Sequence, residues 1–189
     1  KPGFVTAPTS QSIQINAQLS TADPLDQLLR TSLDTVSLDI PLGFLGIDLA
    51  ERRRNRFSAR LLSVSDSDHG RQLELEVAQT FGNCPQYIQA REWEFPEDGA
   101  DQSDAENRTP ESFQSLDKGA QAWIESADTF FVSSAKMGSA GASTRHSEGA
   151  DVSHRGGAPG FIKVEDSNTL LIPDFTGNFH FNTLGNFLE

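Results

Sequence analysis

Alternating hydrophobic and polar positions run through the first half of the chain and predict antiparallel strands. Residues 56–64 and residues 72–78 each alternate apolar with polar side chains, and the polar stretch 65–70 separates them. A period of two is typical of a strand with one face in the core and the other in water. The two segments therefore predict an antiparallel hairpin with one wet face.

Shorter apolar segments and turn signals predict the remaining elements. Asp23, Pro24 and the spaced leucines that follow predict the start of a helix, because Asp caps helices and proline fits their first turn. A second short helix is expected at 116–126, with Ala120, Trp123 and Ile124 on one face. Further strands are expected at 4–5, 13–15, 42–49, 129–134, 151–153, 160–164 and 169–172, and a mobile loop at 137–148. The chain is thus expected to be mainly β.

An acidic segment and an internal repeat suggest how the chain is divided. Residues 92–117 are rich in acidic and polar side chains and predict a linker or surface loop between 1–91 and 118–189. The sequence from Pro2 to Val5 reappears from Pro159 to Ile162, and 12–15 then aligns with 169–172 without a gap. If this is a duplication, 1–91 is the C-terminal part of one repeat and 118–189 the N-terminal part of a second, so the chain is a fragment. The alternative is chance, because Pro-Gly-Phe before a strand is a common turn.

Composition limits the partners that the chain can have. The 189 residues carry a formal net charge of −12, which repels nucleic acid and anionic lipid, so neither is an expected partner. The single cysteine, Cys84, excludes an intrachain disulfide and fits a cytoplasmic location.

No apolar run approaches the roughly 18 residues that span a bilayer. His69, His146 and His154 show no metal-ligand spacing, so no metal is expected.

Several motifs in the second half resemble the pyridoxamine 5′-phosphate oxidase-like, FMN-binding split-barrel family. They lie at 127–134, 149–157, 159–162, 172–178 and 181–186, and residues 52–56 and 81–89 look like matching pieces of its duplicated-barrel subgroup. The resemblance implies an antiparallel split β-barrel with small flanking helices. It also implies FMN bound between two barrels, which are either the subunits of a homodimer or two repeats of one chain.

The expected cofactor residues cluster around a short Arg-Gly-Gly sequence. Arg155, Gly156 and Gly157 offer a bidentate guanidinium beside flexible backbone amides, which is what a phosphate dianion needs. The alternative is a turn whose arginine pairs with Asp151 or Glu148. The resemblance extends the expected FMN-binding residues to Ser153, Asp174, Gly177, Asn178, Asn182 and Thr183.

Two further groups of residues bear on this site. Arg53 and Arg54, in a cluster with Arg52 and Arg56, are expected to bind the phosphate of the flavin or of a nicotinamide donor. The alternative is the solvated start of a strand that balances acidic neighbours. Phe179 and His180 stand where members of the family often carry an arginine.

The expected function is flavin-dependent oxidoreduction, with hydride supplied by NADH or NADPH. No side chain stands out as a catalytic acid or base, and in such enzymes the flavin carries the redox chemistry. The alternatives are a non-catalytic flavin-binding or electron-relay module of a larger reductase, and a structural remnant without flavin. Cys84 is expected to pack in the interior, and a reactive thiol is the alternative reading.

Overall fold

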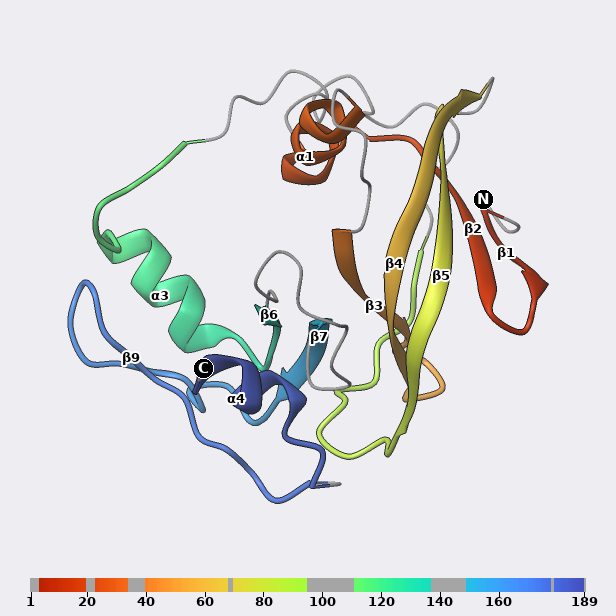
Figure 1. Ribbon diagram of the computed structural model, residues 1–189. Helices are drawn as coiled ribbons and strands as arrows, with labels where there is room; N and C mark the ends of the chain where they lie inside the picture. Colours follow the sequence, from red (N-terminus) through yellow and green to blue (C-terminus); the bar gives the residue numbers. More distant parts are fainter. Residues whose placement is uncertain are drawn as a thin grey trace.

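The computed structural model describes residues 4–19, 23–33, 40–67, 70–94, 111–136, 149–177 and 179–188. Within these ranges the chain is mainly β, with antiparallel sheets and three helices (Figure 1). The mainly β class predicted from the sequence is therefore confirmed. The expected mobile loop at 137–148, most of the expected linker, 95–110, and the expected site residue Asn178 lie outside the described residues.

The largest sheet has the strand order β1-β2-β5-β4-β3, with every neighbouring pair antiparallel. Its strands are β1 (Val5–Thr9), β2 (Ser12–Ala17), β3 (Ile40–Asp48), β4 (Arg53–Ser67) and β5 (Gly70–Asn83). The predicted hairpin is β4 and β5, which continue beyond the alternating segments at both ends. Leu73 and Leu75 are buried while Glu74 and Glu76 are exposed, so the predicted wet face is confirmed.

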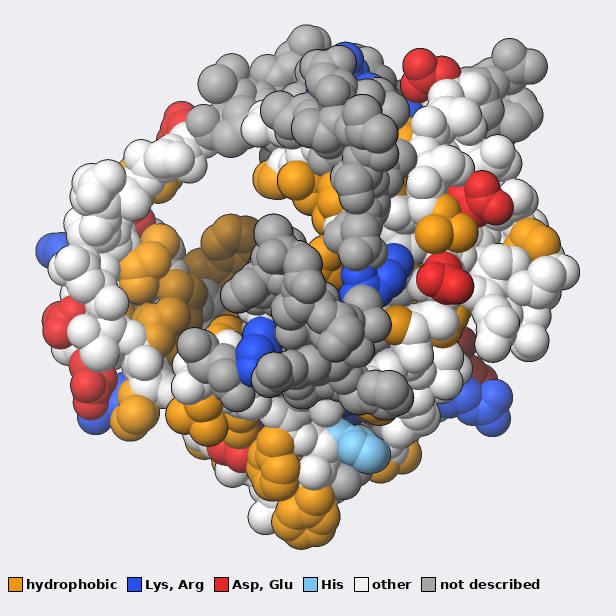
Figure 2. Space-filling view, viewed as in Figure 1, with side chains coloured by type: hydrophobic (Ala, Val, Ile, Leu, Met, Phe, Trp, Pro, Cys, Tyr) orange, Lys and Arg blue, Asp and Glu red, His pale blue; other side chains and the backbone are white. Residues whose placement is uncertain are grey.

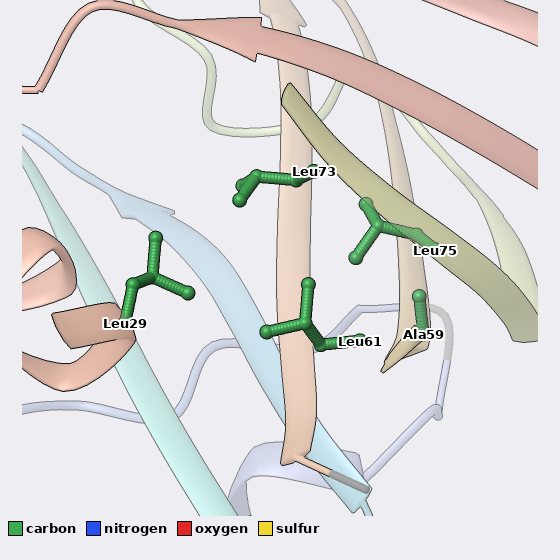
Figure 3. Packing of buried hydrophobic residues seen from close by; sticks show 5 residues of the cluster. All are labelled: Leu29, Ala59, Leu61, Leu73 and Leu75. Atoms are coloured by element: carbon green, nitrogen blue, oxygen red, sulfur yellow. The ribbon is translucent and has the colours of Figure 1, made fainter. Parts of the chain in front are cut away.

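Helix α1 (Pro24–Leu33) covers the buried face of this sheet. Asp23 caps it as expected, since its Oδ1 accepts a hydrogen bond from the Leu25 amide at 2.8 Å. Figure 3 shows Leu29 of the helix facing the leucines of β4 and β5. The buried cluster consists of Leu29, Ala59, Leu61, Leu73 and Leu75. Each fully buried leucine contributes roughly 1.5–3 kcal/mol to folding.

A second sheet, of β6 (Thr129–Lys136) and β7 (Gly149–Gly156), packs against β3 and β4. A close approach lies at Gly43 of β3, where a Cβ atom would stand 3.0 Å from the backbone nitrogen of Asp151. A side chain larger than hydrogen at this position would push β7 away from the sheet. This contact brings the start of β4 and the end of β7, which are far apart in the sequence, to one place.

The third sheet is the short pair β8 (Lys163–Val164) and β9 (Leu170–Leu171), followed by α4 (Asn182–Phe187). One residue pair of this hairpin corresponds to a pair of the hairpin of β1 and β2. Thr6 pairs with Gln14 and Lys163 pairs with Leu171, and both pairs hold the same positions after Phe4 and Phe161. A helix follows each hairpin, α1 after the first and α4 after the second.

Helix α3 (Lys118–Ser126) lies within the second helix expected from the sequence. Asp117 caps it, because its Oδ1 accepts a hydrogen bond from the Ala120 amide at 2.7 Å. Trp123 of this helix is 81% exposed and Trp93 is 64% exposed, so neither tryptophan belongs to the core. Segment 111–117, the described end of the expected linker, is free of helix and strand.

The strands of the described residues form three separate sheets, and none of these sheets is closed into a barrel. What the structure shows is a mainly β protein with a five-stranded antiparallel sheet, and two smaller pairs of strands beside it. None of the described helices combines the length and the apolar character that crossing a membrane requires.

Candidate functional site: a basic pocket between β4 and β7

A pocket of about 70 Å³ lies where the start of β4 meets the end of β7. Three other segments complete its walls: the chain after β5, the chain between β7 and β8, and the chain between β9 and α4. The lining residues are Arg54, Arg56, Cys84, Tyr87, Ser153, His154, Arg155, Gly156, Phe161, Pro173, Phe175, Gly177 and His180. Three of these carry a guanidinium group, which makes the pocket basic in a chain whose net charge is −12.

Two contacts hold the pocket walls together. A Cβ atom on Gly156 would overlap the Tyr87 carbonyl oxygen, so the absence of a side chain lets the segment after β5 lie directly on β7. The Tyr87 hydroxyl donates a hydrogen bond to the Thr176 carbonyl at 3.0 Å, and the Tyr87 ring stacks on Phe175 at 5.2 Å. Tyr87 thus joins the wall after β5 to the wall after β9.

Two of the three arginines are paired with carboxylates. Arg56 Nη1 lies 3.1 Å from Asp151 Oδ2, and both residues are buried. The Thr183 hydroxyl of α4 donates to the same carboxylate oxygen at 2.6 Å. Nearer the surface, Arg155 Nη1 donates to Asp174 Oδ1 at 2.7 Å. These pairs fix the positions of the two guanidinium groups and neutralise most of their charge.

Arg54 is different, because no carboxylate among the described residues pairs with it. Its Nη1 lies 2.8 Å from His154 Nδ1 and donates to the His154 carbonyl at 3.1 Å. Burial lowers the pKa of Arg54, the interaction with Cys84 opposes this, and the nearby charges of Arg56 and Arg155 lower it further. Arginine keeps its proton under such conditions, since its pKa starts far above neutrality. The positive charge of Arg54 is therefore the least compensated of the three in this pocket.

The contact with Arg54 also fixes the proton of His154. A guanidinium group can only donate hydrogen bonds, so His154 Nδ1 must accept, and the ring must carry its proton on Nε2. Burial, followed by the charge of Arg54, lowers the pKa of His154 from 6.5 to about 4. At neutral pH His154 is therefore an uncharged ring with an N–H group at Nε2.

Two buried donors at this pocket have no hydrogen-bond partner: Arg54 Nε and His154 Nε2. His154 is 3% exposed, so water does not replace the missing partner freely. A buried donor without an acceptor costs about 1–3 kcal/mol, and such groups at a pocket point to a ligand that supplies acceptors. Two N–H donors beside an uncompensated guanidinium charge are the donor set that binds an oxyanion.

A wider compartment of about 200 Å³ adjoins the basic pocket and shares Arg155, Phe175, Gly177 and His180 with it. Asp174, Thr176, Phe179 and Phe181 complete its lining. Figure 2 shows hydrophobic side chains gathered along the lower edge of this face, below the position of α4 in Figure 1. The exposed apolar residues of this part of the chain are Leu170, Leu171, Ile172, Phe175, Phe179, Phe181, Phe187 and Leu188. An apolar, aromatic surface thus continues from the basic pocket.

Several residues expected from the sequence meet at the site. Arg54, Ser153, Arg155, Gly156 and Gly177 line the basic pocket, and Asp174 lines the adjoining compartment. Arg155 pairs with Asp174, whereas Asp151, the partner considered from the sequence, pairs with Arg56.

The remaining expected residues lie elsewhere or have other partners. The Gly157 amide donates to the Asp128 carbonyl at 2.9 Å, so it is not available to a phosphate, and Gly156 is paired with Thr129 in the β6–β7 ladder. Arg53 is exposed, and the alternation of β4 places it on the face opposite Arg54. Asn182 opens α4 and lines neither compartment, and Thr183 acts through Asp151.

The sequence reading missed His154 and Tyr87 as site residues, and it treated Arg56 only as part of a basic cluster. Arg54 and Arg56 lie two positions apart in an extended strand, so period-two alternation could have placed them on one face. No local pattern marks His154 or Tyr87, because each acquires its role from a residue distant in the chain. Cys84, expected to pack in the interior, is half-buried and lines the pocket.

Neither the comparison with protein-family models nor those with curated proteins and solved structures gave a match to this chain. Within the described residues, no group of three or more His, Cys, Asp or Glu side chains is arranged to hold a metal ion.

Proposed function

We propose that the chain binds FMN with its phosphate in the basic pocket and acts as a flavin-dependent oxidoreductase that takes hydride from NADH or NADPH. The observation that carries this proposal is the pair of unpartnered buried donors, Arg54 Nε and His154 Nε2, at a pocket lined by three guanidinium groups. A phosphate dianion supplies both the negative charge and the acceptors that this donor set needs. Five of the residues expected from the motifs that resemble FMN-binding split barrels line the same pocket: Arg54, Ser153, Arg155, Gly156 and Gly177.

The sizes of the two compartments suit two different parts of FMN, the phosphate and the ring system. The pocket of about 70 Å³ suits a phosphate group, and the adjoining compartment of about 200 Å³ with Phe175, Phe179 and Phe181 suits part of a flat ring system. Ligand sites are commonly about 300–1,000 Å³. A flavin ring would therefore need a further wall, and in the proposed split-barrel arrangement a second barrel supplies it, from a second subunit or a second repeat.

In this proposal the chain positions the cofactor and the cofactor supplies the redox chemistry. Arg54 and Arg155 hold the phosphate, His154 donates from Nε2 as a neutral ring, and the aromatic surface orients the flavin. The ion pair of Arg56 with Asp151 keeps β4 and β7 in place around the pocket. None of these residues has to transfer a proton, which is consistent with hydride transfer between two bound rings.

Titration of the purified protein with FMN, followed by flavin fluorescence, tests the binding. We expect saturable binding that weakens by at least about tenfold in Arg54→Gln, since a hydrogen bond to a charged group is worth about 1.5–3 kcal/mol. Lys118→Gln, which removes an equal charge from the exposed start of α3, serves as the matched control and should bind as the parent does. Equal binding by both variants, or no binding by the parent, contradicts the proposed site.

Oxidation of NADH or NADPH by the FMN-loaded protein then distinguishes an oxidoreductase from a non-catalytic flavin-binding module. We expect turnover with an added electron acceptor. Tight FMN binding without any turnover would leave the non-catalytic flavin-binding or electron-relay module as the function of this site.

A further inference from the structure

The basic pocket also holds the only cysteine of the chain. Cys84 follows directly on β5, is half-buried, and lines the pocket together with Arg54, Arg56 and Arg155. The Cys84 thiol donates a hydrogen bond to Gln86 Oε1 at 4.0 Å, and the sulfur lies close enough to the Arg54 guanidinium to raise the pKa of Arg54. Cysteines react as thiolates, and they are most reactive where they are partly exposed and surrounded by positive charge. Cys84 meets both conditions, because it is partly exposed and three arginines line its pocket.

A second observation points to a ligand beside this thiol. His154 is 3% exposed and its Nε2 has no partner, and the Nε of Arg54 has none either. Both residues line the same pocket as Cys84. A molecule that brings carboxylate or phosphate oxygens to these donors is thereby held next to the Cys84 sulfur.

We propose that Cys84 is a modification site for small anionic electrophiles, and that a disulfide bearing carboxylates, such as glutathione disulfide, is the class of reactant that it takes. The carboxylate binds at Arg54 and Arg155, and the Cys84 thiolate attacks the nearer sulfur of the bound disulfide. A new S–S bond forms as the old one breaks, and the leaving thiolate carries away the electron pair and takes up the proton that Cys84 gave up. The disulfide is the oxidant, so no other reactant is needed.

The modification has a consequence for the proposed cofactor site. A group attached to Cys84 occupies a pocket of about 70 Å³, so it excludes a phosphate from the same space. This consequence depends on the proposed FMN binding, whereas the reactivity of Cys84 does not. Mixed-disulfide formation would therefore release FMN, and a thiol reductant would restore binding.

Alkylation rates test the reactivity without any flavin. Iodoacetate and iodoacetamide differ mainly in charge, and with one cysteine in the chain every thiol that is alkylated is that of Cys84. We expect the rate ratio of iodoacetate to iodoacetamide, measured by mass spectrometry on the folded protein, to exceed the ratio in denaturant by roughly tenfold, within the range of electrostatic rate enhancement. Arg54→Gln should lower this excess, Lys118→Gln should leave it unchanged, and inorganic phosphate should slow iodoacetate in the folded protein.

Three results would overturn the proposal: the same rate ratio in folded and denatured protein, no effect of Arg54→Gln, or no mixed disulfide with glutathione disulfide at Cys84. The outcome of the FMN titration does not depend on these three results, so the two proposals can fail separately. If FMN does not bind but the anionic preference persists, the modification site stands and the cofactor site falls. If Cys84→Ser binds FMN and the parent shows no anionic preference, the reverse holds.

Discussion

His154 Nδ1 accepts a hydrogen bond from Arg54 Nη1 at 2.8 Å, across 100 positions of the sequence. This contact joins β4 to β7 and fixes the tautomer of the imidazole ring. It also requires that the ring be uncharged, because a protonated His154 would present a second donor, and a second positive charge, to Arg54. The relationship makes stability near the pocket depend on pH.

We predict that folding stability falls as the pH drops from about 6.5 to about 4. The pKa of His154 is lowered to about 4 in the folded protein, so the unfolded chain binds the proton first and the folded state loses stability through this window. The contribution is on the order of 3 kcal/mol, from about 1.4 kcal/mol per pKa unit. Urea unfolding at several pH values measures it. His154→Gln, which does not titrate, should show a weaker dependence over the same window, and an identical dependence would contradict the prediction.

A second prediction concerns the buried pair of Arg56 and Asp151. Asp151→Asn removes the carboxylate that Arg56 and Thr183 share, and it should destabilise the protein by about 3–5 kcal/mol because a buried charge loses its counter-charge. Thr183→Val should cost less, about 1.5–3 kcal/mol, since it removes one hydrogen bond to a charged group. Thermal or urea unfolding measures both.

The exposed pair of Arg155 and Asp174 provides the control for that prediction. Its side chains are 27% and 47% exposed, so Asp174→Asn should change stability by only about 0–1 kcal/mol. A loss with Asp174→Asn as large as that with Asp151→Asn would show that burial does not determine the strength of these pairs.

A third prediction tests the contact between β7 and the segment after β5. Gly156→Ala places a Cβ atom on the Tyr87 carbonyl oxygen, so the two pocket walls must separate, at a cost of about 1–3 kcal/mol typical of overpacking. Gly82→Ala is the matched control, because no atom lies within 4 Å of its Cβ position. We expect Gly156→Ala to weaken phosphate or FMN binding as well, and Gly82→Ala to leave binding as it is. Equal effects of the two changes on unfolding would argue against close packing at Gly156.

A fourth prediction tests the core beneath α1. Leu75 is fully buried and Leu62 is 49% exposed. Leu75→Ala should cost about 2–5 kcal/mol in unfolding free energy through lost burial and the cavity that remains. Leu62→Ala should cost well under half as much, and comparable losses would place the core elsewhere.

The hairpin of β4 and β5 and the capped helix α1 could be predicted from the sequence, because alternation and capping are properties of neighbouring residues. The pocket could be predicted only in part. Arg155 was expected to bind an anion, but its partner Asp174 was not expected as an ion pair, since the bend that brings them together depends on the whole segment between. Whether Arg53 and Arg54 lie on opposite faces of a strand depends on where β4 begins. The alternating segment started only at 56, whereas the strand starts at Arg53. The closeness of Gly156 to Tyr87 arises from tertiary packing, for which the sequence has no local signal.

The Arg56–Asp151–Thr183 connection draws on three parts of the chain, from the start of β4 to α4. Loop closure over such distances is slow compared with the formation of a hairpin. During synthesis the β4–β5 hairpin can therefore fold early, while the anion pocket has to wait until the ribosome has released the residues of α4. A nascent chain would have its scaffold well before it could retain any ligand.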